Sequence, residues 1–455
     1  MTTARTDHAL RLRQHLLNRR VAPASIAAMR AALLVLTVLL CATTVSAQTQ
    51  PSLKALAPEI ETHLQKAILD FWFPRSLDRE FGGYLVGFDA AGRPAGAGTK
   101  MIVTQARMLW VAARLVRAGR GGEEMRKAAR QGYRFLMDRM WDTQHGGFYW
   151  EVDRRGAVVQ PHKHLYGQAF GLFALSEYAR ATGDAGALAD ARRLFALLEE
   201  KAHDPRHGGY IEFFAPDWSP PPAGVRPYLG PEAGLKLMNT HLHLMEALST
   251  FVRAGGDDRA RLRLVELIAI QSHAVIRREM GAGTDQHRAD WTPLLDGDRG
   301  RASYGHDLEN IWLIVDALDA LGLPSQPLMN LFRQLFANAL EHGYDRTAGG
   351  FYDSGPLGRP ADRLDKVWWV QAEALVSALT MYRLTGEAIY ARVFADTWRF
   401  VNDRQTDWSS GEWHPTIAPD GTARGAKGSS WKAAYHNARA LLECLERIDG
   451  LTIAK

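Results

Sequence analysis

Three histidines lie within or at the start of apolar stretches that have helical spacing: His243, His306 and His436. Histidine can both take and return a proton near neutral pH, because its unperturbed pKa is about 6.5. His243 and His306 are each followed three residues later by a glutamate, Glu246 and Glu309. This spacing places histidine and carboxylate one turn apart on the same helix face. The pattern predicts acid–base chemistry by histidines that are oriented by carboxylates.

Other functional side chains interrupt predicted apolar helices. Trp369 and Glu373 lie four residues apart in one such stretch, Trp312 follows His306 in another, and Arg107 lies early in a third. Indole rings stack on the apolar faces of sugars. We therefore predict that Trp312 and Trp369 contact a sugar.

The His-x-x-Glu step also occurs among the ligands of di-iron helical bundles. Such a centre needs bridging carboxylates from further helices, and Glu373 is the one obvious candidate. The glycine-rich motifs that hold dinucleotides or phosphates are missing from the sequence. We therefore expect neither a metal nor a cofactor. A single histidine in a helix is usually a packed or surface residue, but three at comparable stages of successive repeats are predicted to face one cavity.

A turn motif recurs along the chain and organises these segments. An aspartate precedes, by four residues, a Gly-Gly-aromatic or Gly-Glu-aromatic step. The copies begin at Gly82, Gly146, Gly208, Gly349 and Gly411, with a degenerate copy near 281–285. Each period of about 62 to 70 residues holds two stretches of helical periodicity. We predict an all-α fold, an (α/α)6 toroid of six helix pairs with short β-hairpin loops, and an open solenoid is the alternative.

Residues 1–47 are predicted to be a signal peptide. The uncharged apolar run 31–42 has the length of a signal-peptide core, and a small-x-small cleavage pattern ends at Ala47. The leader is unusually long, and Met29 would begin one of ordinary length. Residues 48–455 then form a single domain, which we expect to be exported to a periplasm by either the Sec or the Tat route.

The leader also accounts for the basic charge of the chain. The whole chain has a net charge of +5, and residues 1–47 carry six arginines and one aspartate. The mature protein is therefore close to neutral, which argues against a nucleic-acid partner. Cys41 lies in the leader and Cys444 is alone, so no disulfide framework is expected. We expect a small-molecule sugar as partner, no membrane span after leader cleavage, and a monomer or homodimer.

On these residues the chain resembles the N-acylglucosamine 2-epimerase superfamily, and within it the cellobiose 2-epimerases. The resemblance covers nearly all of the mature chain. The matching segments are Ala106 to Trp110, Lys163 to Tyr166, Leu242 to Ala247, Ser303 to Glu309, Val367 to Ala374 and Trp431 to Asn437. The resemblance implies the (α/α)6 fold and a sugar 2-epimerase or aldose–ketose isomerase.

The resemblance also implies roles by position. Histidines matching His306 and His436 act as the acid/base pair at C2, and the one matching His243 assists ring opening. Glutamates matching Glu309 and Glu373 orient these groups. The predicted substrate-binding residues are Arg107, Tyr166, Asn239, Glu246, Trp312 and Trp369. The implied substrate is an unphosphorylated sugar: a disaccharide of the cellobiose or mannobiose type, mannose or glucose, or an N-acylglucosamine.

The chemistry fits these groups. A base must remove the C2 proton of an open-chain aldose while donors hold the enediolate oxygen. Return of a proton to the other face of C2 gives the epimer, and return to C1 gives the ketose. Two other classes stay open. A glycoside hydrolase or lyase on the same toroid needs two carboxylates across a glycosidic bond, and a non-catalytic exported protein would bind sugar without turnover.

Overall fold

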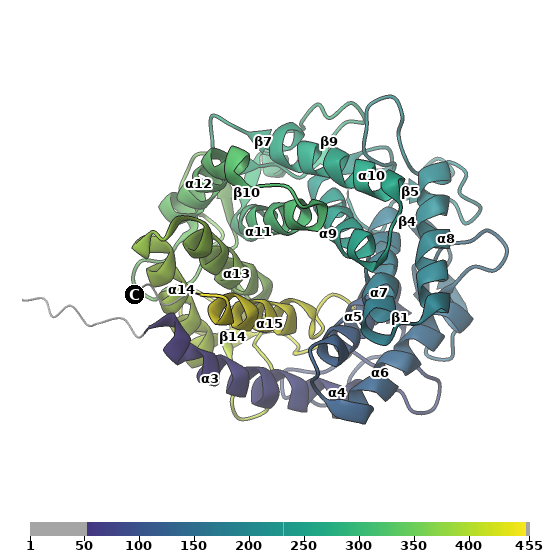
Figure 1. Cartoon of the computed structure of the whole chain (residues 1–455), viewed down its shortest axis with the longest axis horizontal. Coiled ribbons are helices and arrows are strands. Elements are labelled where there is room, and N and C mark those ends of the chain that lie inside the picture. Colours follow the sequence, from purple (N-terminus) through teal and green to yellow (C-terminus); the bar gives the residue numbers. More distant parts are fainter. Residues whose placement is uncertain (1–51, 231, 452–455) are drawn as a thin grey trace, which may run out of the picture. The chain divides into compact units, whose positions relative to one another are not determined.

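The computed structural model describes residues 52–230 and 232–451, and the predicted leader lies outside them. In the part from Ser52 onward, helices form two concentric rings (Figure 1). The inner ring consists of α5 (Ile102–Arg117), α7 (Leu165–Thr182), α9 (Met238–Ala254), α11 (Tyr304–Leu321), α13 (Trp368–Thr385) and α15 (Tyr435–Asp449). Neighbouring inner helices pack on one another, and α15 closes the ring on α5. This is the toroid of six helix pairs that the turn spacing predicts.

The outer ring supplies one helical segment for each inner helix. It consists of α3 (Leu53–His63) with α4 (Asp70–Ser76), α6 (Gly122–Phe135), α8 (Ala185–Lys201), α10 (Asp258–Ala269), α12 (Met329–Asn338) and α14 (Ala388–Phe400). A π-helical segment joins α3 to α4 or ends the outer helix at Leu64–Leu69, Leu136–Met140, Ile270–Ala274, Ala339–Gly343 and Val401–Gln405. The apolar stripe of each outer helix packs against the inner ring, so one buried core runs between the rings. Within the described residues, no helix is both long and apolar enough to cross a membrane.

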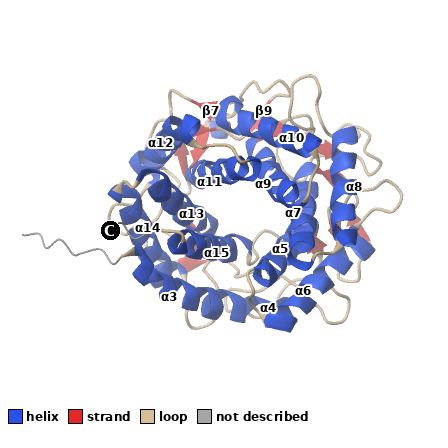
Figure 2. Cartoon of the chain, in the orientation of Figure 1, coloured by secondary structure: helices blue, strands red, loops and turns tan. Residues whose placement is uncertain are grey.

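Short antiparallel strands stitch neighbouring pairs together, and Figure 2 shows them between the helices. They are β1 (Lys100–Met101), β2 (Glu151–Val152), β3 (Val158–Gln160), β4 (Lys163–His164), β5 (Phe213–Phe214), β6 (Lys236–Leu237), β7 (Ile276–Arg277), β8 (Ala282–Gly283), β9 (Gln286–His287), β10 (Arg301–Ser303), β11 (Ser354–Pro356), β12 (Lys366–Val367), β13 (Thr416–Ile417) and β14 (Ala423–Arg424). The strand that leads into an inner helix pairs with a strand that follows the next turn: β1 with β2, β4 with β5, β6 with β9, β10 with β11 and β12 with β13. The inner helices α5, α7, α9, α11 and α13 therefore begin at the stitched end of the ring.

One buried ion pair recurs in five of the six helix pairs. Lys163, at the start of β4, places its Nζ 2.7 Å from Oδ2 of Asp142 in the preceding turn. The equivalent pairs are Lys100–Asp78, Lys236–Asp204, Lys366–Asp345 and Lys427–Asp407, at 2.6 to 2.9 Å. In these four, the lysine also donates to the carbonyl of the first glycine of the turn. The sequence pattern identified the aspartates, and the structure adds their lysine partners.

A glutamine in the first turn of the inner helix holds the aromatic residue of the turn. The Phe148 N–H donates to Gln168 Oε1, and Gln168 Nε2 donates to the Phe148 carbonyl, both at 2.8 Å. Gln105 and Gln371 make the same pair of bonds to Tyr84 and Phe351. The second glycine of the turn must be small, because Gly147 has φ +73° and a Cβ there would lie 2.6 Å from the Trp218 ring.

The degenerate copy near 281–285 is a true member of the series. Ile276 of β7 pairs with Gly283 of β8, and Gly281 has a positive φ of +59°. Asp307 takes the place of the glutamine, because its Oδ1 accepts from the Gly283 N–H at 2.8 Å. Burial raises the pKa of Asp307 to about 8, so this carboxyl is neutral at pH 7 like the amide it replaces.

The recurring ion pair gives the first prediction. Lys163→Met removes the cation from a pair that is almost fully buried and leaves the Asp142 carboxylate without its charge partner. Breaking a buried pair on one side costs about 3–5 kcal/mol. Urea unfolding should therefore show a loss of this order. The double variant Asp142→Asn with Lys163→Met should recover part of it, and a double variant that merely adds both single losses would contradict a coupled pair.

Candidate active site

The first turns of the inner helices surround a cavity of about 250 Å³. It is lined by Arg107, Tyr166, Leu229, Asn239, His243, His306, Glu309, Trp368, Trp369, Trp431 and His436. Eight of these were predicted from the sequence. Leu229, Trp368 and Trp431 were not, although the two tryptophans lie in the segments that carried the family resemblance. Because the helices begin here, their N-terminal partial positive charges gather around the cavity, which favours an anionic intermediate.

Two histidines are oriented by buried carboxylates. His243 Nδ1 lies 2.9 Å from Glu246 Oε2, and His436 Nδ1 lies 2.7 Å from Glu373 Oε1. A carboxylate at Nδ1 favours the tautomer that carries its proton there and leaves Nε2 as the basic nitrogen. The His243–Glu246 pair is the one that the three-residue spacing predicts.

The prediction that Glu309 pairs with His306 is wrong, because the two side chains have different contacts. His306 Nδ1 is buried without a partner, and its ring packs against Trp369 at 4.7 Å between centroids. The Glu309 carboxylate turns to Arg439 instead, with Oε1 2.7 Å from Nη2. The spacing fixes the shared helix face, but a long glutamate side chain can follow the stronger charge partner.

Arg439 links the carboxylates that line or support the cavity. It is 1% exposed and donates to Glu246, to Glu309 and to Glu373, which come from α9, α11 and α13. It also contacts the Tyr435 hydroxyl. The sequence held a signal for this residue, since an arginine one turn after His436 lies on the same face of an otherwise apolar helix, but no role was assigned to it.

Burial and the neighbouring charges set the protonation of these groups. Burial opposes ionisation of Glu246, but Arg439, His243 and Tyr435 outweigh it and lower its pKa to about 2. Burial and the nearby Glu373 carboxylate raise the pKa of Glu309 to about 7. Burial lowers the pKa of His306 to about 3, with a smaller contribution from His243. Burial and the arginines Arg107 and Arg439 lower the pKa of His436 well below 6.5. The imidazoles of His306 and His436 are therefore neutral bases at pH 7.

The one described group with metal-ligand spacing lies in this site. Glu309, Glu373 and His436 offer ligand atoms within 4.8 Å of one another. Oε1 of both glutamates accepts from Arg439 at 2.7 Å, and His436 bonds to Glu373. The guanidinium therefore already provides positive charge where a metal ion would bind.

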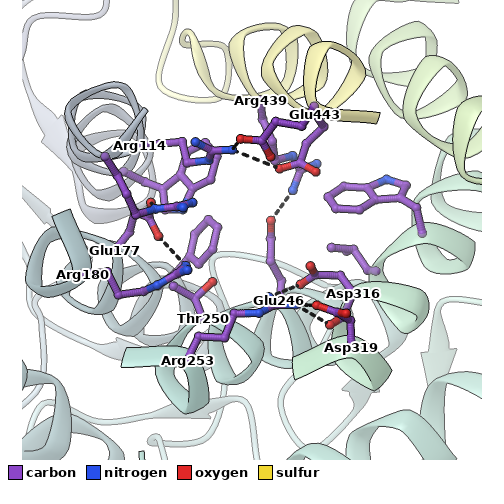
Figure 3. Close-up of a pocket in the computed structure, with 16 residues that line it drawn as sticks. Arg114, Glu177, Arg180, Glu246, Thr250, Arg253, Asp316, Asp319, Arg439 and Glu443 are labelled. Atoms are coloured by element: carbon purple, nitrogen blue, oxygen red, sulfur yellow. Dashed lines mark hydrogen bonds and ion pairs between the residues drawn. The ribbon is translucent and has the colours of Figure 1, made fainter. Parts of the chain in front are cut away.

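A second cavity, of about 200 Å³, lies further along the inner helices, toward their C-terminal ends (Figure 3). Its arginines are paired within the chain: Arg180 with Glu177 at 3.0 Å, and Arg253 with Asp316 at 2.8 Å. The first cavity differs in degree, because five buried polar atoms of its lining have no partner, Arg107 Nε among them, against two in the second cavity, Trp110 Nε1 and Arg439 Nε. His306 Nδ1, Asn239 Oδ1 and Glu309 Oε2 share this feature. The first cavity therefore gathers more unpaired polar groups, and the three predicted histidines line it and not the second, so we take it as the candidate active site.

Two predicted substrate contacts belong elsewhere. Trp312 and Glu246 line the second cavity, not the first. Trp312 Nε1 donates to Glu373 Oε2 at 3.0 Å, and the Arg439 guanidinium lies 4.7 Å from its ring centroid. Trp312 therefore supports the Glu373 carboxylate instead of stacking on a sugar, and Glu246 orients His243. Glu373 likewise reaches the cavity only through His436.

The family described as N-acylglucosamine 2-epimerase (GlcNAc 2-epimerase) matches residues 82–440. This chain belongs to that family. The cellobiose 2-epimerase of Dictyoglomus turgidum is 31% identical over 87% of this chain and 100% of its own length. That of Bacteroides fragilis is 30% identical over 86% of this chain and 98% of its own. The structure of the cellobiose 2-epimerase from Spirochaeta thermophila has a TM-score of 0.79 and 35% identity, covering 89% of this chain and 99% of that one.

The family resemblance and the (α/α)6 fold are thereby confirmed. The chain is an isomerase, a carbohydrate 2-epimerase, as the sequence predicts.

The pKa of Glu309 gives the second prediction. Its Oε2 has no hydrogen-bond partner within the chain and Glu309 lines the cavity, so the protonated carboxyl can donate to a sugar oxygen. Because the pKa is about 7, the value of kcat/KM should fall as the pH rises through this range. Glu309→Gln donates at every pH, so its profile should lack this fall. The same inflection in the variant would assign it to another group.

Proposed function

We propose that the chain epimerises an unphosphorylated aldose at C2, with His306 and His436 as the acid/base pair. The observation that carries this is the shared cavity. The two histidines come from α11 and α15, and both rings pack against Trp369, at 4.7 and 5.9 Å between centroids. His436 is buried and His306 is partly buried, and loss of solvent around each imidazole lowers its pKa and keeps it neutral. Two basic nitrogens on different walls of one cavity suit proton transfer at two faces of one carbon.

The steps balance without an external reagent. His243, oriented by Glu246, transfers the proton that opens the sugar ring. One neutral histidine then takes the proton from C2, and the electron pair moves onto the carbonyl oxygen to give an enediolate. The negative charge favours protonation, by a proton from solvent, of the imidazole that faces it on the other side. That imidazole returns a proton to C2, the carbonyl re-forms, and exchange with solvent restores both histidines.

Arg107 is proposed to hold the oxygen on which charge develops. Its Nη2 donates to the Tyr166 hydroxyl at 3.0 Å, and its Nε has no hydrogen-bond partner. The guanidinium is flanked by the rings of Phe170 and Tyr435, with centroids at 4.3 and 4.9 Å. These rings fix the plane of the guanidinium, so it presents its free donors in a set direction.

We propose a disaccharide with an aldose at its reducing end as the substrate. Trp431 lines the cavity yet is 41% exposed, and behind it lies the buried Trp150, at 6.2 Å between ring centroids. An exposed indole at the edge of the cavity suits a second sugar ring. The names of the relatives, cellobiose 2-epimerases, support the same substrate class.

The geometry does not favour the hydrolase alternative. Glycoside hydrolysis needs two carboxyl groups on either side of the scissile bond. Glu246, Glu309 and Glu373 all converge on Arg439, so they share one side.

Export stays a proposal, because the leader lies outside the described residues. If Ala47 ends the leader, the native protein should begin near Gln48 and fractionate with the periplasm. N-terminal sequencing of protein from its own cells tests this. An intact Met1 on cytosolic protein would exclude the proposed export.

The acid/base pair gives the central prediction. His306→Ala and His436→Ala should each lower the rate of C2 inversion by about 10²- to 10⁴-fold, the usual loss for one positioned acid or base. The remaining histidine can still exchange the C2 proton at its own face. In D2O, NMR should therefore show exchange without inversion for the sugar epimer of matching configuration.

The control is Arg253→Met, which breaks an ion pair at the second cavity and leaves the acid/base pair intact. It should retain native inversion in the folded protein. Native inversion rates in both histidine variants would exclude the proposed mechanism.

A further inference from the structure

One of the recurring turns carries a buried carboxylate where four others have glycine. Gly83, Gly147, Gly209 and Gly350 have φ between +66° and +78°, and Glu412 occupies the same position with φ +71°. A non-glycine residue in this left-handed region costs roughly 1 kcal/mol or more. Glu412 is nevertheless fully buried. The contacts of the Glu412 carboxylate explain why this strained residue is present.

The Glu412 side chain has space because the residue of the inner helix that faces this turn is shorter than in the other turns. In the other turns, a Cβ on the second glycine would collide with the residue that clamps the turn or with a neighbouring ring, as with Gln371 Oε1 at 2.7 Å from Gly350. In the last helix pair the corresponding residue is Asn437, which is one methylene shorter. The Glu412 carboxylate takes over the clamp, since its Oε1 accepts from the Trp413 N–H at 2.8 Å.

The same carboxylate holds both ends of a short segment that lines the active site. Glu412 Oε1 accepts from Lys432 Nζ and from Asn437 Nδ2, each at 2.6 Å. Its Oε2 accepts from the indole of Trp72. Lys432 follows Trp431, and Asn437 follows His436, so both of these Oε1 partners are adjacent to a residue of the cavity wall.

This segment is an insertion relative to the other helix pairs. In four of them the clamping residue follows the turn lysine by five positions, as Gln168 follows Lys163. Here Lys427 makes the usual pair with Asp407, yet Asn437 comes ten positions later. The five extra residues bring Trp431 into the cavity wall and also bury a second lysine, Lys432, whose charge Glu412 neutralises. Insertion and glutamate are therefore complementary.

We propose that Glu412 is a positioning residue for the epimerase: it sets Trp431 through Lys432 and His436 through Asn437. The proposal rests on the proposed function of the cavity. Glu412 does not line the cavity, and these two arms are its contacts that lead to the cavity wall. The Lys432 arm governs the position of Trp431 and hence substrate affinity. Lys432 Nζ also lies 5.6 Å from the ring centroid of Trp368. The Asn437 arm governs the base and hence the rate of proton transfer.

The test compares the two arms by steady-state epimerisation of cellobiose. Lys432→Met should raise KM several-fold with a smaller change in kcat. Asn437→Ala should lower kcat about 10- to 100-fold, as expected when a base moves by a fraction of an ångström to an ångström, with little change in KM. Glu412→Gln, which keeps the shape but removes the charge, should do both. A purely structural role predicts no such split, because unfolding lowers the active fraction and leaves KM unchanged.

Arg253→Met, far from the insertion, serves as the matched control for lost stability and should keep the native KM and kcat in its folded fraction. Equal KM and kcat in native protein and all three variants, each verified as folded by circular dichroism, would overturn the positioning role alone. Native protein that neither inverts nor exchanges C2–H of unphosphorylated aldoses and disaccharides would overturn the proposed function and the positioning role with it. Failure of Glu412→Gln to fold leaves the split between the two single-arm variants as the deciding measurement.

Discussion

The guanidinium of Arg439 holds carboxylates from three different inner helices, and the arrangement of the active site follows from this contact. Burying one arginine with Glu246, Glu309 and Glu373 leaves more negative than positive charge in a region with little water. Isolated buried charges are costly unless they are paired or neutralised. The site relieves the excess on Glu309, whose pKa is about 7, and on Glu373, whose pKa burial raises. The carboxylate that keeps its charge most firmly, Glu246, is the one that orients His243.

The arginine can make these contacts only if α9, α11, α13 and α15 begin at matching heights. Two repeated devices secure this: a lysine–aspartate pair in the turn and a side chain that clamps the backbone of the aromatic residue. Both act at the stitched end of the ring, beside the cavity. Because neither device reaches the cavity itself, the frame can stay regular while the residues that point inward differ from helix to helix. In the second cavity, which lies beyond the Arg439 layer, Arg180 and Arg253 are paired with carboxylates of the chain itself.

The sequence reveals the fold and the histidines of the site, but not how deep in the ring each side chain lies. The regular spacing of the turns was enough for the fold, and the histidines were found because ionisable residues in apolar helices are conspicuous. Helical periodicity gives the face on which a residue lies but not its depth along the ring. His306, Glu309 and Trp312 occupy three successive turns of one face of α11. The cavity extends along the first two turns, so Trp312 falls beneath it and packs on Arg439. Glu246 is displaced in the same way on α9.

Contacts between residues that are distant in sequence could not be predicted for a related reason. The pairing of Glu373 with His436, and of Glu412 with Lys432 and Asn437, depends on how adjacent helix pairs meet, which no local pattern encodes. Glu412 is nevertheless marked by an exception, since it breaks a Gly-Gly rule that four turns obey. Asp307 marks another, because a protonated carboxyl replaces the clamping glutamine one residue after His306. Both exceptions lie at the foot of a helix that carries a proposed catalytic histidine. In a repeated fold, the copies that depart from the repeat are therefore the positions where structure has been adapted to chemistry, and the regular copies supply the reference that makes the departure visible.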